Sequence, residues 1–264
     1  MSSNSATDNP RIDLSDRVAV VTGASRGIGY AVARALSKAG AHIIAVARTS
    51  GGLEELDDEI KADGGSATLV PLNLTDYEAL DRLGAAIFER WKKLDILVAN
   101  AAILGPLTPL AHVKPNKWDE IVGINLTANW RLIASLDPLL RQSDAGRAVF
   151  MTTGATYRPR AYWGPYTVTK MALEQMVLTY AEEVASSPLR VNLINPGPVR
   201  THMRAQAFPG EDPESLVLPA DIVANIVSLC GPDVTAHGLI YDVPKDCFLN
   251  RPMPNESGSA APAD

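Results

Sequence analysis

Tyr166 and Lys170 are the two residues whose types and spacing point most directly to chemistry. Residues four positions apart share a helix face, so the amine would lie beside the phenol. An ammonium there favours the phenolate and lowers the tyrosine pKa from its usual value of about 10. The pair would then exchange a proton near neutral pH. Many helices carry such a pair only for packing, so its meaning depends on the elements around it.

Short apolar runs alternate with longer amphipathic segments, and this alternation predicts the elements that position the pair. Strands are expected at 18–22, 42–47, 67–72, 94–99, 147–153, 189–194 and 239–243. Helices are expected at 28–39, 53–62, 77–91, 117–141, 166–186 and 220–230. Asp137-Pro138 predicts a kink or break in the fourth helix. The order predicts one doubly wound α/β sheet of about seven parallel strands, with helices on both faces and ligands at the carboxyl ends of the strands.

The length and composition exclude several classes of protein. The 264 residues suit one large domain, expected over 14–250, with disordered tails at 1–13 and 251–264. The net charge of −6 argues against a nucleic-acid partner, because excess cations are needed to neutralise phosphates. The sequence also lacks a signal peptide and any apolar run near the roughly 20 residues of a membrane span. We therefore expect a cytoplasmic protein without a membrane partner.

The cysteines and histidines show no spacing that would hold a metal ion. Cys230 and Cys247 are expected to be reduced thiols, as is usual in the cytoplasm. The four histidines are scattered along the chain. No catalytic metal is therefore expected.

A glycine-rich turn directly follows the first expected strand. Residues 22–29 read Thr-Gly-Ala-Ser-Arg-Gly-Ile-Gly, and a helix follows. Such glycines let the backbone approach a pyrophosphate, and a helix N-terminus offers free N–H groups and a positive dipole end. The Gly-x-x-x-Gly-x-Gly spacing differs from the common Gly-x-Gly-x-x-Gly fingerprint. The order of strand, glycine turn and helix nevertheless predicts phosphate binding here.

The chain resembles the short-chain dehydrogenase/reductase family in five motifs, in order between about residues 16 and 245. These are the glycine turn at 22–29, Asn100-Ala101-Ala102, Asn125, Tyr166-x-x-x-Lys170 and Asn195-Pro196-Gly197. The resemblance implies a Rossmann-type fold and an NAD(P)-dependent oxidoreductase that interconverts a carbonyl compound and a secondary alcohol. It also implies a homodimer or homotetramer formed through two long helices.

The resemblance assigns residues to the cofactor site as well. It places Asn73 at the adenine, Asn100 and Ala101 along the ribose, and Thr201 at the nicotinamide carboxamide. The family usually has Asp at position 73, and Asn73 keeps a hydrogen-bonding side chain. The expected cofactor-binding residues are Gly23, Ser25, Arg26, Gly27, Ile28, Gly29, Arg48, Asn73, Leu74, Asn100, Ala101, Ala102, Tyr166, Lys170, Pro196, Gly197, Val199 and Thr201.

Arg48 follows the second expected strand, where NAD-preferring sheets carry an acid that binds the ribose 2′-hydroxyl. The first acid downstream is Glu54. Arg48 and Arg26 offer two guanidinium groups, which suit a 2′-phosphate through forked hydrogen bonds. The alternative is that both are solvated surface residues. The missing acid and the paired cations favour NADP(H) over NAD(H).

By the resemblance, Tyr166 is the catalytic acid/base and Lys170 also binds the nicotinamide ribose. Asn125 would hold a helix distortion and a water of a proton relay. The family usually has Ser about thirteen residues before the tyrosine, and this chain has Thr153. Threonine keeps the hydroxyl that would hold the substrate oxygen, and its methyl group narrows the site. The alternative is that the methyl group misplaces the hydroxyl and activity is poor.

The substrate is expected between loops 154–165 and 202–216, of which the second reads as a mobile lid. Arg158, Arg160 and Arg204 would suit an anionic substrate. The favoured interpretation is that they are surface or subunit-contact residues, since exposed arginines are the norm. The substrate is then a small-molecule carbonyl or alcohol compound.

Two other functions remain open. Thr153 is the one feature that favours a cofactor-binding regulator with weak or no catalysis. The segment 241–244, Tyr-Asp-Val-Pro, lacks the Gly-Gly that the family commonly has there. This difference favours an assembly subunit with altered oligomer contacts.

Overall fold

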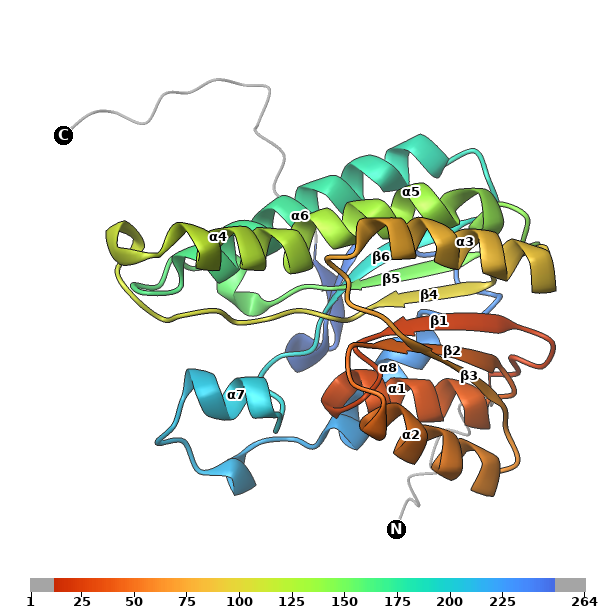
Figure 1. The fold of residues 1–264 in the computed structure, drawn as a ribbon, viewed down its shortest axis with the longest axis horizontal. Coiled ribbons are helices and arrows are strands. Elements are labelled where there is room, and N and C mark those ends of the chain that lie inside the picture. Colours follow the sequence, from red (N-terminus) through yellow and green to blue (C-terminus); the bar gives the residue numbers. More distant parts are fainter. Residues whose placement is uncertain (1–11, 250–264) are drawn as a thin grey trace, which may run out of the picture.

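The computed structural model describes residues 12–249, so the expected tails lie outside the described residues except for 12 and 13. One sheet of eight strands runs through the molecule in the order β3-β2-β1-β4-β5-β6-β7-β8 (Figure 1). The strands are β1 Val18–Thr22, β2 His42–Ala47, β3 Ala67–Pro71, β4 Ile96–Ala99, β5 Arg147–Met151, β6 Arg190–Asn195, β7 Ile240–Asp242 and β8 Cys247–Leu249. The first seven are parallel, as expected for a doubly wound sheet.

The eighth strand was not expected. A 3₁₀ turn, Val243–Lys245, and the left-handed backbone of Asp246 (φ 50°) reverse the chain after β7. β8 then pairs antiparallel with β7 and forms the edge of the sheet. A three-residue strand is too short to show alternation in the sequence, and no glycine marks its turn. The segment that lacks the family's Gly-Gly therefore forms this hairpin.

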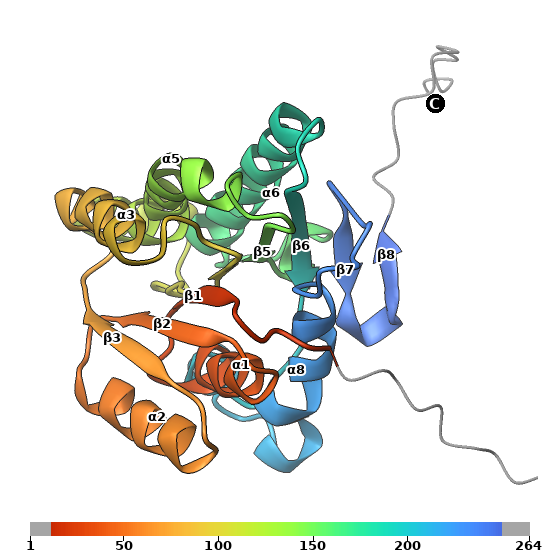
Figure 2. The ribbon, with the colours of Figure 1, turned by 90° about the vertical axis from the view of Figure 1, so that its right-hand side faces the viewer.

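Helices cover both faces of the sheet (Figures 1 and 2). One face carries α1 Gly27–Lys38, α2 Gly51–Ala62 and α8 Pro219–Ser228. The other carries α3 Tyr77–Trp91, α4 Pro115–Val122, α5 Ala128–Leu140 and α6 Gly164–Val184. The short α7, His202–Ala207, lies apart from both layers (Figure 1). Further 3₁₀ turns are Leu110–His112, Gly154–Thr156 and Pro213–Ser215.

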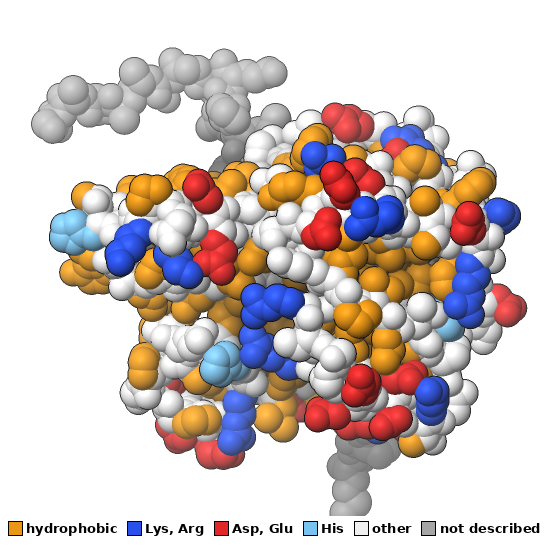
Figure 3. Space-filling view, in the orientation of Figure 1, with side chains coloured by type: hydrophobic (Ala, Val, Ile, Leu, Met, Phe, Trp, Pro, Cys, Tyr) orange, Lys and Arg blue, Asp and Glu red, His pale blue; other side chains and the backbone are white. Residues whose placement is uncertain are grey.

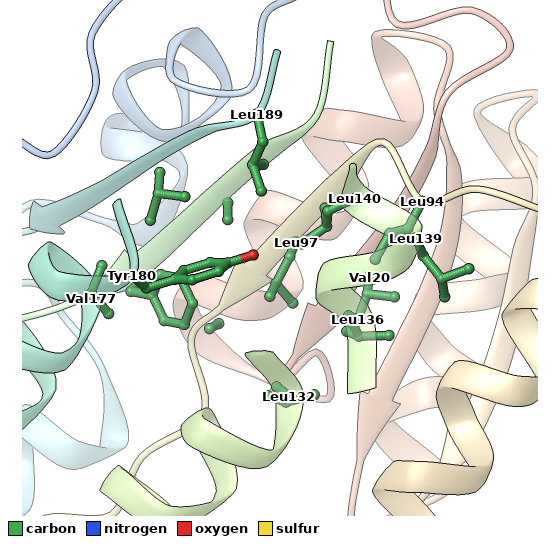
Figure 4. Close-up of a cluster of buried hydrophobic side chains, with 14 of the residues drawn as sticks. Val20, Leu94, Leu97, Leu132, Leu136, Leu139, Leu140, Val177, Tyr180 and Leu189 are labelled. Atoms are coloured by element: carbon green, nitrogen blue, oxygen red, sulfur yellow. The ribbon is translucent and has the colours of Figure 1, made fainter. Parts of the chain in front are cut away.

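The core between the sheet and the second helix layer fixes where α5 and α6 lie. Val20 of β1 and Leu97 of β4 belong to the same buried cluster as Leu132 and Leu136 of α5 (Figure 4). Full burial of each such side chain contributes about 1.5–3 kcal/mol. Tyr180 of α6 joins this cluster, and its hydroxyl donates to Asp137 at 2.7 Å. The helix that carries Tyr166 is thus anchored along its length.

The helix expected at 117–141 is divided, but not at its proline. α4 ends at Val122, a π-helical turn spans Gly123–Thr127, and α5 begins at Ala128. Of the kink or break predicted at Asp137-Pro138, the break is wrong, because α5 runs through Pro138 to Leu140. The proline lies in the last turn, where its missing N–H removes little of the helix. Across residues 12–249, no helix has the length and apolarity to span a membrane.

Candidate active site

Three of the four candidate catalytic residues come from two neighbouring elements. Thr153 follows β5, and Tyr166 and Lys170 lie in the first two turns of α6. Pro165 in the first turn suits a helix start, because its missing N–H has no helical partner there. Tyr166 is 8% exposed and Lys170 is 2% exposed. The sequence-predicted pair is therefore enclosed by protein.

Lys170 is held against the end of β5. Its Nζ donates to the carbonyl oxygen of Met151, the last residue of that strand, at 2.7 Å. Burial lowers the pKa of Lys170 to about 8, and the negative charge of Glu174 opposes this shift. The amine thus titrates much nearer neutral pH than an exposed lysine does.

Tyr166 does not have the lowered pKa that the i,i+4 spacing predicted. Burial raises its pKa, and a hydrogen bond with the Thr153 side chain only partly opposes that effect. Burial removes water from the phenolate and so favours the neutral phenol. The phenol is therefore protonated at neutral pH, which is the form that donates a proton to a carbonyl oxygen.

Two hydrogen bonds hold the backbone that directly follows Thr153. Its Oγ1 accepts from the N–H of Ala155 at 3.3 Å and caps the 3₁₀ turn that follows. Asn195, at the end of β6, accepts from the N–H of Gly154 at 2.9 Å. The hydroxyl that contacts Tyr166 is thus attached to a fixed turn.

Glu174 is a buried functional candidate that the sequence analysis missed. It is 1% exposed and accepts from the hydroxyls of Thr152 at 2.5 Å and Thr156 at 2.9 Å. These threonines flank Thr153, so one carboxylate restrains the turn and also acts on Lys170. The signal that would have found it is its position one helical turn beyond Lys170, on the same face of α6.

Asn125 lies at the centre of the π-helical turn and is fully buried. Its side chain accepts from the N–H of Ile103 and donates to the carbonyl oxygen of Ile103, both at 2.9 Å. It also donates to Thr169 of α6 at 3.2 Å. Asn125 therefore joins the segment after β4 to the helix that carries Tyr166 and Lys170, and the helix distortion expected at this residue is present.

The glycine turn has the shape of a phosphate cradle. Gly23 and Gly27 have φ of +68° and +59°, a region that side chains other than glycine rarely adopt. A Cβ on Gly29 would lie 2.3 Å from the carbonyl oxygen of Gly23. The Arg26 side chain does not cap α1, and among residues 12–249 no side chain accepts from the first-turn N–H groups. Close backbone and a free helix N-terminus fit the pyrophosphate of a dinucleotide.

The neighbouring strand ends complete this region. Asn100 donates from its side chain to the carbonyl oxygen of Thr22 at 2.9 Å. The Thr22 hydroxyl accepts from the N–H groups of Asn100 and Ala101 at 3.0 and 3.1 Å. A Cβ on Gly27 would meet the Thr201 side chain at 3.6 Å, so the segment after β6 reaches the turn. The segments after β1, β4 and β6 thus meet at one site.

The other predicted cofactor residues also lie at or just beyond strand ends. Arg26 and Arg48 are exposed, and among residues 12–249 neither forms an ion pair. Asn73, after β3, accepts from the N–H of Thr75 at 3.3 Å.

A group of Lys and Arg side chains lies at the middle of the face shown in Figure 3, beside a hollow between α4 and α7. The remaining predicted residues follow strand ends, except Ile28 in the first turn of α1; they are Ser25, Leu74, Ala102, Pro196, Gly197 and Val199.

The expected lid at 202–216 contains ordered elements, which the sequence analysis did not predict. They are α7 and the 3₁₀ turn Pro213–Ser215. Arg204 of α7 donates to both carboxylate oxygens of Glu211 at 2.5 Å. Across residues 12–249, no cluster of three or more His, Cys, Asp or Glu side chains could hold a metal ion.

Comparison with known proteins gives one consistent family. Residues 17–212 match the family model for short chain dehydrogenases. The chain is 37% identical to the uncharacterized oxidoreductase YciK of Escherichia coli K12, over 85% of this chain and 90% of that protein.

Two solved structures extend this likeness. A short chain dehydrogenase from Shigella flexneri, complexed with NADP, superposes with a TM-score of 0.84 at 36% identity, covering 88% of this chain and 98% of that one. One from Escherichia coli CFT073, complexed with NADPH, gives 0.83 at 36% identity, with the same two coverages. The chain therefore belongs to the short chain dehydrogenase family, as an NAD(P)-dependent oxidoreductase.

Proposed function

We propose that this protein interconverts a carbonyl compound and a secondary alcohol with NADP(H), using Tyr166 as the acid/base. The observation that carries the proposal is a buried phenol, Tyr166, beside the Thr153 side chain and one helical turn from the buried Lys170. The site lies at the strand ends that also form the glycine cradle.

The side chains divide the reaction between them. NADPH, when bound, supplies the hydride that reduces the carbonyl carbon. Tyr166 donates its proton to the carbonyl oxygen, and the Thr153 hydroxyl holds that oxygen as charge develops. Lys170 holds the ribose of the cofactor. Asn125 keeps α6 in register with the segment after β4, and we propose that it also serves a water relay to Lys170.

The cofactor preference follows from charge at the end of β2. Arg48 stands where an acid would bind the 2′-hydroxyl of NAD, and Arg26 lies in the glycine turn. Two exposed guanidinium groups without acidic partners in the described chain favour a 2′-phosphate. The NADP and NADPH in the two related structures support the same preference.

We also propose a homodimer or homotetramer formed through α5 and α6. Trp130 of α5 is 50% exposed, and Val168 and Met171 of α6 are 46% and 42% exposed. Large apolar side chains gathered on two long helices favour a partner surface. Size-exclusion chromatography with light scattering tests this, and a monomer would contradict it. The cytoplasmic location remains a prediction.

The alternative hypothesis, a cofactor-binding regulator with little catalysis, is based on Thr153 standing in place of serine. The hydrogen bond between Thr153 and Tyr166 favours a working catalytic site instead. A panel of ketones, aldehydes and secondary alcohols with NADPH and NADH, followed by nicotinamide absorbance, tests the choice. Turnover supports the enzyme, and NADPH binding without turnover of any compound would support the regulator.

A further inference from the structure

A cavity of about 690 Å³ opens beside Thr153, between the turn that follows β5 and the β7–β8 hairpin. Its lining includes Thr153 and Trp163. Trp163 also packs edge-on against Tyr166, with ring centroids 6.0 Å apart. Tyr166 does not itself line the cavity, but Thr153 does, so a substrate held at the Thr153 hydroxyl can extend into it.

The cavity is lined by more positive than negative charge. The cations are Arg158, Arg160, Arg204 and Lys245. The two acids, Glu174 and Asp242, are 1% and 3% exposed. Because the whole chain carries a net charge of −6, this positive lining is a local feature.

Both acids are occupied by hydrogen bonds from the protein. Glu174 accepts from the Thr152 and Thr156 hydroxyls. Asp242 accepts from the Asn195 side chain at 3.1 Å and from the backbone N–H of Lys245 at 3.2 Å. These neutral donors do not cancel the two negative charges, but the four cations still outnumber the two acids around the cavity.

Three of the four cations have no acidic partner among residues 12–249: Arg204 is paired with Glu211, whereas Arg158, Arg160 and Lys245 form no ion pair. Arg160 lies beside two aromatic rings, with its guanidinium carbon 5.7 Å from the Trp163 ring centre and 5.6 Å from that of Phe208. A cation–π contact attracts the guanidinium without using its N–H groups as hydrogen-bond donors to an acid, so they can bind an oxyanion. Arg158, Arg160 and Lys245 are exposed, so all three can reach a ligand that enters the cavity from solvent.

We propose that the substrate is an oxo acid, a carbonyl compound that also carries a carboxylate, and that Arg160 binds this carboxylate together with Arg158 and Lys245. This inference rests on the proposed function. The carbonyl carbon gains a hydride from NADPH, which is oxidised to NADP⁺, and its oxygen gains a proton from Tyr166. The carboxylate stays unchanged and selects the substrate.

Matched pairs of substrates test the proposal. The complete enzyme is assayed with NADPH on aryl oxo acids of increasing chain length, and on the methyl ester of each. At least one acid should exceed its ester in kcat/KM by tenfold or more. Equal values for every acid and its ester would overturn the inference and leave the proposed function standing, whereas no turnover of any compound would contradict the proposed function itself.

A variant and its matched control locate the effect. Arg160→Gln should reduce the acid-over-ester ratio at least fivefold through KM, and Arg160→Lys should retain part of it. Arg90→Gln removes another guanidinium stacked on a tryptophan, Trp91, outside the cavity lining, and should leave the ratio unchanged. An unchanged ratio in Arg160→Gln would contradict the assignment.

A binding measurement does not depend on turnover. In calorimetry with the NADP⁺-loaded protein, benzoate should bind at least tenfold more tightly than benzamide. The difference should shrink in Arg160→Gln and persist in Arg90→Gln. Equal binding of benzoate and benzamide by the wild-type protein would overturn the proposal.

Discussion

Replacing Thr153 with valine removes the hydroxyl while keeping nearly the same side-chain shape. That hydroxyl makes two contacts: one to the Tyr166 phenol, and one from the N–H of Ala155. The two contacts have separate consequences. The first bears on catalysis, because the hydroxyl would hold the substrate oxygen, and the second bears on the stability of the 3₁₀ turn.

The two magnitudes differ enough to be separated. Loss of one oxyanion donor costs about 2.7–4 kcal/mol, or roughly 100- to 1,000-fold in kcat. Loss of a helix cap costs about 0.5–2 kcal/mol of unfolding free energy. The Ala155 bond is long at 3.3 Å, so we expect the lower end of that range. Thr153→Val should therefore be nearly inactive and still folded.

The assay compares Thr153→Val with Thr153→Ser, which keeps the hydroxyl. The measurements are kcat on the best panel substrate, the Kd for NADPH, and the unfolding free energy in urea. We expect Thr153→Ser to keep most of the activity and both variants to bind NADPH as wild type does. A Thr153→Val enzyme with unchanged kcat would refute the role given to this hydroxyl.

Two further predictions concern the charges of the site. Burial lowers the pKa of Lys170 from 10.5 to about 8. The unfolded chain therefore binds this proton more tightly than the folded chain does. As a result, the unfolding free energy should rise with pH between about 8 and 10.5. One pKa unit corresponds to about 1.4 kcal/mol, so Lys170→Met should raise the unfolding free energy by at most about 3 kcal/mol at pH 7. Loss of the hydrogen bond from Lys170 to the Met151 carbonyl oxygen reduces this increase. Urea unfolding should show this difference in unfolding free energy disappearing by pH 10.5. A difference that does not change with pH would contradict the burial argument. Arg48→Asp should lower kcat/KM for NADPH at least tenfold and raise that for NADH, measured as initial rates; equal use of both cofactors by the wild-type enzyme would contradict the assigned preference.

The sequence predicted the order and type of the main elements because their patterns are local. The strands at 18–22 and 42–47 and the helix at 77–91 have the predicted bounds, since apolar runs and helical periodicity mark them clearly. The hairpin that ends in β8 was missed because it depends on pairing with β7 rather than on a pattern of its own. Likewise, the π-helical turn at Asn125 follows from contacts with Ile103 and Thr169 that periodicity does not reveal.

The sequence predicted which residues meet at the site better than it predicted their pKa values. Spacing places Lys170 beside Tyr166 but cannot give the burial of either group. In the structure, burial outweighs the favourable contacts and raises the tyrosine pKa. Glu174 escaped notice because a glutamate in a helix is usually solvated, and only the tertiary fold brings Thr152 and Thr156 to it.

Tyr166→Phe tests the central claim most directly, because it removes one hydroxyl and keeps the ring that packs on Trp163. The measurement is a single-turnover reaction of the enzyme–NADPH complex with the best panel substrate, alongside the Kd for NADPH. We predict that NADPH binds within about threefold of wild type while its oxidation falls at least 1,000-fold, within the range for lost proton transfer and oxygen contact together. Oxidation of NADPH at a rate near that of wild type would contradict the assignment of Tyr166 as the acid/base.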